Sequence, residues 1–480
     1  MRVDFNFIHL LLTSVITTDK NFSITSIGWR AFLIEDLLDR IQQRSRLRFT
    51  HIVLTDCEAA ILNRKSCRSD VIALRKLRGD PLPPPDLDLL ASLETEGVPT
   101  IHNMILGDRV VRNLPNAEAF SYATLLVNRI RDVLKAKRPD VVIGGFDSLH
   151  AGIGLAVCRS LKIPWVAMSF TPIPIGYMAF CDRICPDATL KILRPINESL
   201  KHEATEALVA FESRRSKTPA YVSTHSVGMV LKNLPKHLSG AIRRMTIVLD
   251  GRFDRFTTPS LLKSCKQYFR KRRNTFLFQN KLFTRQPPAG RFALFALHMQ
   301  PESTIDGWAP FFSDQFHQIK QIVRAMPPNI KLLVKVHISD ADNYSPRQLR
   351  QLLRLPNVQL VHPTSSSRDF INQADLIIGI QGTICLESAM LGKPVLMFGE
   401  SPYLQFPSVE RIGRITDLSA QICSAISRPK PSRDEIFSAY MLYLSSYMPA
   451  RYNDWKQPLN DEDIARFTTC FNRLRGHILS

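Results

Sequence analysis

The second half of the chain alternates short apolar runs with stretches in which apolar residues recur every three or four positions. The apolar runs predict five buried strands, at residues 292–297, 331–336, 358–361, 376–380 and 395–398. Helical spacing between the strands predicts helices over residues 312–323, 347–355, 366–373 and 384–391. Strands that alternate with helices in this way form a parallel sheet covered by helices on both faces.

The first half repeats this alternation less regularly. Strands are predicted within residues 5–17 and at 50–55, 140–146 and 164–170, and the clearest helices at 117–135 and 149–161. We therefore expect an α/β protein made of two Rossmann-like, doubly wound lobes that face a central cleft. After about residue 428 the apolar positions again have helical spacing and include aromatic residues, which predicts C-terminal helices that pack across the two lobes.

A basic stretch separates the two halves. Residues 261–291 contain nine Lys or Arg and no Asp or Glu, and they end in the Pro-Pro-Ala-Gly sequence typical of a linker. The predicted organisation is a first lobe over residues 1–260, a linker over 261–291, a second lobe over 292–427 and terminal helices over 428–480. Phenylalanines alternate with the basic residues, so the stretch could bind an anionic membrane surface or be a solvated linker.

Composition and charge narrow the class of protein. Of the 480 residues, 45% are hydrophobic and 22% are charged, which excludes a disordered or collagen-like chain. The nine cysteines are odd in number and scattered, so we expect free thiols and a cytoplasmic protein. No apolar window is long enough to span a bilayer, so any association with a membrane would be peripheral. The net charge of +20 favours anionic partners, and no nucleic-acid-binding motif accompanies it.

Polar residues follow four of the predicted strands. In the second half they are His298, Gln300, Glu302 and Ser303 after one strand, His337 after the next, and Gln381, Gly382 and Thr383 further on. In the first half they are Asp147, Ser148 and His150. Ligands of an open parallel sheet bind at the carboxyl ends of the strands, so we expect all these residues around one cleft.

Some of these residues form a candidate phosphate site. The Gly382–Thr383 turn opens a helix, whose free N–H groups could hold a phosphate, although Thr383 could equally be an ordinary N-cap. Glu387, one turn along, could accept a hydrogen bond from a ribose hydroxyl or face solvent. Lys335 and His337 project from the same face of their strand, as a phosphate site would require, but a strand-end histidine is more often structural.

Candidate catalytic groups occur in both halves. Glu302 follows a buried strand and precedes two hydroxyl residues, a position suited to a nucleophile or general base but also to a helix cap. Asp147 and His150 form an Asp-x-x-His group at a helix start, where either could act as a base from the opposite lobe. The competing interpretation is a helix cap made by Asp147 or Ser148.

Three segments of the second half resemble the bacterial capsule polysaccharide biosynthesis family in order and spacing. They are residues 296–304, 335–337 and 381–399. This family is similar to the two-lobed GT-B glycosyltransferases, and it includes transferases that move Kdo from CMP-Kdo onto a lipid-linked acceptor. The resemblance covers residues 292–400 strongly and 138–185 weakly.

The resemblance implies roles for individual residues. Glu302 would be the catalytic acidic residue, His337 the histidine that contacts the donor phosphate, and the Gly382–Thr383 turn the element that holds it. The sequence departs from the family in two places, because Ile338 replaces a proline and Glu302 replaces the aspartate of the Kdo transferases. The implied donor is therefore a nucleotide sugar, with CMP-Kdo as one candidate.

The residues and the resemblance agree on one outline. We expect a glycosyltransferase that needs neither a metal nor a cofactor, in which helix dipoles and basic side chains stabilise the leaving nucleotide phosphate. Its acceptor would be a capsule or other surface polysaccharide, or the lipid-linked primer of one. Two alternatives stay open: a nucleotide-sugar epimerase of the same fold, and a non-catalytic protein that binds polysaccharide or lipid during capsule assembly.

Overall fold

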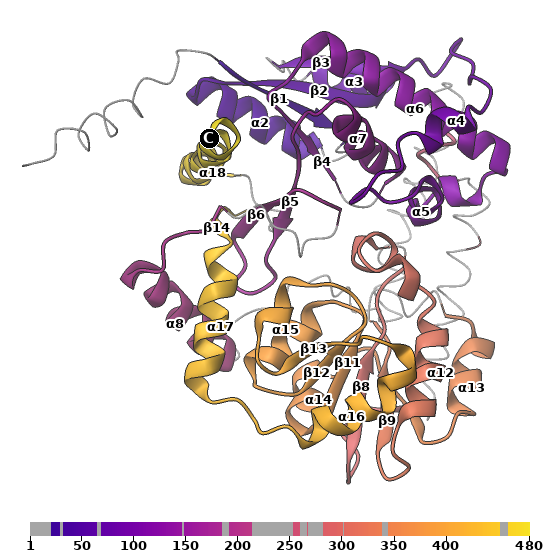
Figure 1. The fold of residues 1–480 in the computed structure, drawn as a ribbon, viewed down its shortest axis with the longest axis vertical. Helices are drawn as coiled ribbons and strands as arrows, with labels where there is room; N and C mark the ends of the chain where they lie inside the picture. The colour runs from indigo at the N-terminus through magenta and orange to yellow at the C-terminus, as the bar shows by residue number, and fades with distance from the viewer. Residues whose placement is uncertain are drawn as a thin grey trace, which may run out of the picture.

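The computed structural model contains two lobes stacked along the long axis of the molecule (Figure 1). It describes residues 21–28, 32–64, 69–145, 148–184, 192–213, 253–259, 266, 282–300, 302–337, 344–451 and 459–480. Several predicted features lie outside these ranges: the strand within residues 5–17, Asp147, Ile338 and most of the basic stretch. The side chain of Ser303 is also outside the description.

The first lobe is built on a seven-stranded sheet with the order β14-β6-β5-β4-β1-β2-β3. Its strands are β1 (Phe22–Ile27), β2 (Leu47–Thr55), β3 (Asp70–Arg75), β4 (Val141–Gly144), β5 (Trp165–Phe170), β6 (Tyr177–Cys181) and β14 (Met448–Pro449). The strands from β5 to β3 are parallel, whereas β6 pairs antiparallel with both β5 and β14.

Helices cover both faces of the first sheet. They are α2 (Phe32–Arg44), α3 (Asp56–Arg64), α4 (Leu87–Ala91), α5 (Ile101–Gly107), α6 (Asn116–Lys137), α7 (Leu149–Ser160) and α18 (Asp461–Leu479). Side chains alternate between the faces of each strand, so β4 sends Val142 into the core beneath α6 and α7, and Val141 and Ile143 into the core beneath α2 and α18.

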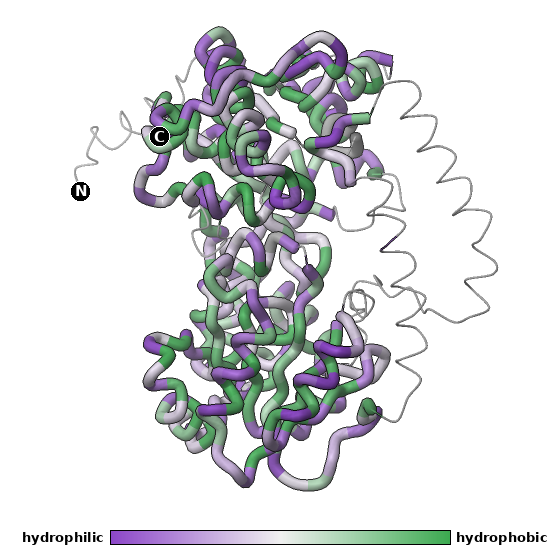
Figure 2. The backbone as a smooth tube through the Cα atoms, turned by 90° about the vertical axis from the view of Figure 1, so that its right-hand side faces the viewer, coloured by the Kyte–Doolittle hydropathy of each residue, from purple (hydrophilic) through white to green (hydrophobic). Residues whose placement is uncertain are grey.

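The second lobe is built on a fully parallel sheet with the order β13-β12-β11-β8-β9-β10-β7. Its strands are β7 (Phe283–Thr284), β8 (Phe292–Ala296), β9 (Lys331–Lys335), β10 (Val358–Val361), β11 (Leu376–Gly379), β12 (Val395–Met397) and β13 (Val409–Arg411). Its helices are α12 (Gln315–Ala325), α13 (Pro346–Leu353), α14 (Ser367–Gln373), α15 (Thr383–Met390), α16 (Leu418–Ser427) and α17 (Arg433–Ser445). The side view in Figure 2 shows hydrophobic and hydrophilic segments interleaved in both lobes.

Elements from both halves of the chain join the two lobes. Helix α8 (Glu198–Glu212) and α17 lie side by side along one edge of the molecule (Figure 1), and both contribute to a core cluster that contains residues of β8 and β11. The chain then passes through β14 into the first sheet and ends in α18, whose Asp461 pairs with Arg44 of α2 at 2.8 Å. Across this junction the Tyr443 hydroxyl donates a hydrogen bond to Thr171 Oγ1 at 2.8 Å.

The predicted fold class is confirmed: the chain forms two α/β lobes with largely parallel sheets and C-terminal helices. β7, within the stretch predicted as a linker, is an edge strand of the second sheet, and α8, within the range predicted for the first lobe, packs in the core of the second. Within the described residues, no helix is both long and apolar enough to cross a membrane.

Candidate functional site

The strand order of the second sheet indicates where a ligand would bind. From β8 the chain first adds β9 and β10 on one side, and it then adds β11, β12 and β13 on the other. The carboxyl ends of β8 and β11 therefore flank the switch point at which such sheets bind ligands. His298 follows β8 and Gln381 follows β11. These two residues, both predicted to bind the nucleotide sugar, therefore meet at this point.

His298 and Gln381 contact each other directly. The Gln381 backbone N–H donates to Nε2 of the buried His298 ring, with a donor–acceptor distance of 3.3 Å. Burial, helped by the neighbouring His337, lowers the pKa of His298 from 6.5 to about 4. His298 is therefore neutral at pH 7, with Nε2 as the acceptor and the remaining proton on Nδ1.

Gly382, which follows Gln381 at the switch point, is the N-cap residue of α15. Its backbone angles are φ 101° and ψ 166°, a region that only glycine adopts readily, and a methyl group at this position would lie 2.7 Å from His298 Cε1. No side chain caps α15, and Thr383 is its first helical residue. The alternative that Thr383 is an ordinary N-cap is therefore wrong, because glycine takes the position that the tight turn requires.

Several hydrogen-bond donors in and next to this helix start have no partner in the described structure. Among the described residues, neither the Thr383 nor the Ile384 backbone N–H has a hydrogen-bond partner. The Gln381 side chain is 1% exposed, and its Nε2 also lacks a partner. Free N–H groups at a helix start suit a ligand that carries negative oxygens, whereas the Gln381 side chain packs toward Gly399, with its Cγ 3.0 Å from the methyl position there.

Charged side chains surround the switch point. Burial lowers the pKa of Lys335 to about 8, an effect that the nearby Glu387 opposes. Burial raises the pKa of Glu387 to about 7, against the opposing effect of Arg368 and Lys335. The Lys335 ammonium also donates to the Pro363 carbonyl at 3.0 Å. His337, whose pKa is lowered by burial and by Lys335, lies within electrostatic range of both Lys335 and His298.

The loop after His298 holds Gln300 and Glu302 in place. Gln315 of α12 accepts the His298 backbone N–H at 2.7 Å and donates to Gln300 Oε1 at 3.1 Å. Gln300 in turn donates to Asp306 Oδ1 at 3.0 Å, and the Glu302 N–H donates to Asp306 Oδ2 at 3.0 Å. Gln300 therefore stabilises this loop through its side-chain hydrogen bonds. The Glu302 backbone is held at both ends, because its carbonyl also accepts a hydrogen bond from the Asp306 N–H at 2.8 Å.

Ser148 and His150 of the first lobe lie at the corresponding switch point, between β1 and β4. His150 is buried, and its Nε2 lies 2.9 Å from both the Gly28 carbonyl and Ser148 Oγ. Because a carbonyl only accepts, His150 Nε2 carries the proton. Ser148 is the N-cap residue of α7 but makes no capping bond; instead Asp108 accepts the Leu149 N–H at 3.0 Å.

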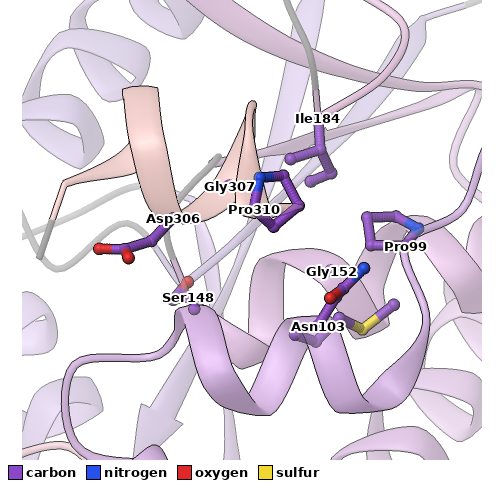
Figure 3. A pocket seen from close by; sticks show the side chains of 10 residues that line it. Pro99, Asn103, Ser148, Gly152, Ile184, Asp306, Gly307 and Pro310 are labelled. Carbon is purple, nitrogen blue, oxygen red and sulfur yellow. The ribbon is translucent and has the colours of Figure 1, made fainter. Parts of the chain in front are cut away.

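A pocket of about 400 Å³, part of it open to solvent, lies between the start of α7 and the loop that carries Asp306. Figure 3 shows Ser148 at the start of its helix facing the loop that carries Asp306. Both lobes line the pocket, through Pro99, Asn103, Met104, Gly107, Ser148, Gly152 and Ile184 on one side and Asp306, Gly307 and Pro310 on the other. The described residues contain no cluster of three or more His, Cys, Asp or Glu side chains that could hold a metal ion.

Asp306, Gln315 and Arg112 were not among the residues predicted from the sequence. Arg112 Nη1 of the first lobe lies 4.0 Å from Asp306 Oδ1. Gln315 lies inside the amphipathic pattern of its helix, and Arg112 lies outside every predicted element, so neither carries a sequence signal. Asp306 had one weak signal, since it follows Glu302 by four residues in the same polar loop.

Among known proteins, similarity to this chain was found only in solved structures. No family model matches it, and no curated protein does. Solved structures similar to it include UDP-GlcNAc 2-epimerase from Neisseria meningitidis bound to UDP-GlcNAc, with 12% identity and a TM-score of 0.30, covering 88% of this chain and 97% of that one. A complex of S. aureus MnaA with UDP has 12% identity and a TM-score of 0.31, with 96% and 98% covered. The Thermosulfurimonas dismutans KpsC β-Kdo 2,7-transferase has 14% identity and a TM-score of 0.32, with 72% and 89% covered.

Proposed function

We propose that this protein is a glycosyltransferase that takes a sugar from a nucleotide-sugar donor and adds it to a surface polysaccharide or to its lipid-linked primer. The acceptor class and the candidate donor CMP-Kdo come from the sequence resemblance. The donor site is argued from the residues at the β8–β11 switch point. A cytoplasmic location and a peripheral contact with the inner membrane remain predictions.

The uncapped start of α15 is the observation that carries the proposal. The free N–H groups of Thr383 and Ile384 and the Thr383 hydroxyl together offer donors to a phosphate. The dipole of the helix favours negative charge at the same place. Gly382 gives the turn the backbone conformation that starts α15, and Lys335 supplies a positive charge near Glu387 of this helix.

The reaction needs a base for the acceptor hydroxyl and stabilisation for the leaving nucleotide. The acceptor oxygen forms a bond to the anomeric carbon while the bond from that carbon to the phosphate oxygen breaks. Glu302, as general base, takes the proton of the acceptor hydroxyl, or it attacks the anomeric carbon as a nucleophile in a two-step route. Asp147 and His150 are the candidates for the second proton-handling group, from the opposite lobe. The α15 amides stabilise the negative charge that develops on the phosphate.

The first test is binding of CMP, CDP, UDP and GDP, followed through the unfolding temperature. A nucleotide that binds the folded state at 100 times its dissociation constant adds about 2.7 kcal/mol of stability. We expect one nucleotide to be preferred, and Thr383→Val to weaken its binding by roughly tenfold, because a hydrogen bond to a charged group is worth about 1.5–3 kcal/mol. Thr469→Val, the same change on α18 where the hydroxyl only bonds Ala465, is the matched control. Absence of binding by all four would reject the proposal in favour of a non-catalytic polysaccharide- or lipid-binding protein.

A second measurement separates transfer from epimerisation. An epimerase would use the same phosphate contacts but would convert the nucleotide sugar in the absence of an acceptor. We expect intact nucleotide sugar without acceptor, free nucleotide with acceptor, and loss of this reaction in Glu302→Gln. An isomerised nucleotide sugar formed by the donor and enzyme alone would instead identify an epimerase.

A further inference from the structure

Asp306 occupies an unusual position between the Glu302 loop and the opposite lobe. It lies in the π-helical turn η2 (Ser303–Gly307), its side chain is 8% exposed, and it lines the interlobe pocket. One carboxylate oxygen accepts the Glu302 N–H, and the other accepts from Gln300 and lies 4.0 Å from Arg112 Nη1 of the first lobe. A single carboxylate therefore contacts both the loop that carries Glu302 and the other lobe.

The backbones approach each other at the same place. A methyl group on Gly107, at the end of α5, would lie 3.1 Å from the Asp306 carbonyl oxygen. The η2 turn therefore rests against α5 with no room for a larger side chain. A change in the separation of the lobes must move Arg112 relative to Asp306, and Asp306 is bonded to Glu302 through both its carboxylate and its backbone N–H.

We propose that Asp306 is a positioning residue that couples contact between the lobes to the orientation of Glu302. With Arg112 close, the carboxylate is held in the geometry that fixes the Glu302 N–H. With Arg112 withdrawn, only Gln300 remains to orient the second oxygen, and the loop loosens. The role assigned to Glu302 rests on the proposed function, but the coupling between Arg112 and the loop does not.

Amide hydrogen exchange of residues 302–306 tests the coupling in the full-length protein. We expect Arg112→Met and Asp306→Asn each to raise the exchange rate of the Glu302 amide at least fivefold. The matched controls are Arg291→Met and Asp375→Asn, because Asp375 likewise accepts a backbone N–H, that of Phe292 at 3.0 Å, and pairs with Arg291 at 3.1 Å, but at the other end of β8. An unchanged rate in Arg112→Met, or an equal rise in the controls, would overturn the proposal.

Steady-state kinetics give the second readout. We expect Asp306→Asn to lower kcat for glycosyl transfer at least tenfold while KM for the donor stays within twofold, and the control variants to change neither. A wild-type kcat in Asp306→Asn would overturn the positioning role. If the nucleotides fail to bind wild type while Arg112→Met still accelerates exchange, the proposed function fails and the coupling stands.

Discussion

At the scale of single residues, each lobe packs a histidine against a glycine with positive φ at its switch point. In the second lobe the pair is His298 and Gly382, and in the first it is His150 and Gly28, where a methyl group would lie 2.1 Å from His150 Cδ2. Glycine is required twice over at both places, for its backbone conformation and for the absent side chain. Each imidazole therefore packs directly against the glycine of its turn.

Replacing Gly382 with alanine tests this packing. The backbone strain alone should cost roughly 1–3 kcal/mol of unfolding free energy. Gly290→Ala is the matched control, because Gly290 also has a positive φ of 92° but nothing lies within 4 Å of its missing methyl group. We expect Gly382→Ala to lose more stability than Gly290→Ala in urea unfolding and also to lose nucleotide binding, since His298 or α15 must move. Equal losses of stability with nucleotide binding retained would contradict the account.

At the scale of elements, the sequence predicts strands well where they are buried on both faces. β8, β11 and β12 lie within continuous apolar runs, β9 has a lysine at each end of three apolar residues, and all four were predicted within one or two residues. β1 was missed because polar side chains interrupt it, in FSITSI, and β3 was missed although DVIALR contains four consecutive apolar residues. β7 and β14 contain two residues each, and they exist only because a neighbouring strand provides hydrogen-bond partners. No local pattern marks such strands.

The placement of α8 gives a prediction at the same scale. Phe211 of α8 is 5% exposed, belongs to the core cluster of the second lobe, and has the Arg368 guanidinium 4.3 Å from its ring centroid. Phe211→Ala should therefore cost about 3–5 kcal/mol and lower hydrogen-exchange protection in β8 and β11 rather than in β2. Phe311→Ala, at a side chain that is 83% exposed, should change little. Loss of protection confined to the first sheet would show that α8 belongs with that lobe instead.

At the scale of the whole molecule, the sequence predicts which loops meet within one sheet but not what crosses between the lobes. His298, Lys335 and Gln381 could be grouped from sequence, because parallel strands bring their carboxyl ends to one edge. The contact of Asp306 with Arg112 could not, because it depends on the angle between the lobes, which α8, α17 and β14 set by crossing the junction. The proposed donor site is therefore the part that could be predicted from the sequence.

Acid stability is a property of both lobes together, since each contains a buried neutral histidine. His51 of β2 is fully buried and lies 2.7 Å from Ser26 Oγ, and burial lowers its pKa from 6.5 to about 4, against an opposing effect of Asp39. His298 has a similarly lowered pKa in the second lobe. Below pH 6.5 these histidines bind protons in the unfolded chain but not in the folded protein. The free energy of unfolding therefore decreases as the pH falls from about 6.5 to 4.

The loss should reach roughly 3 kcal/mol for each histidine, because one pKa unit corresponds to about 1.4 kcal/mol. Urea unfolding at pH 7.5, 5.5 and 4.0 measures it. We expect His51→Gln to flatten the decline by up to that amount, and His317→Gln, at an exposed position on α12, to leave the decline unchanged. A His51→Gln protein with the same pH dependence as wild type would mean that the His51 imidazole gains its proton without unfolding. The first sheet would then have to open to water around β2, where Nε2 of His51 has no hydrogen-bond partner in the described structure.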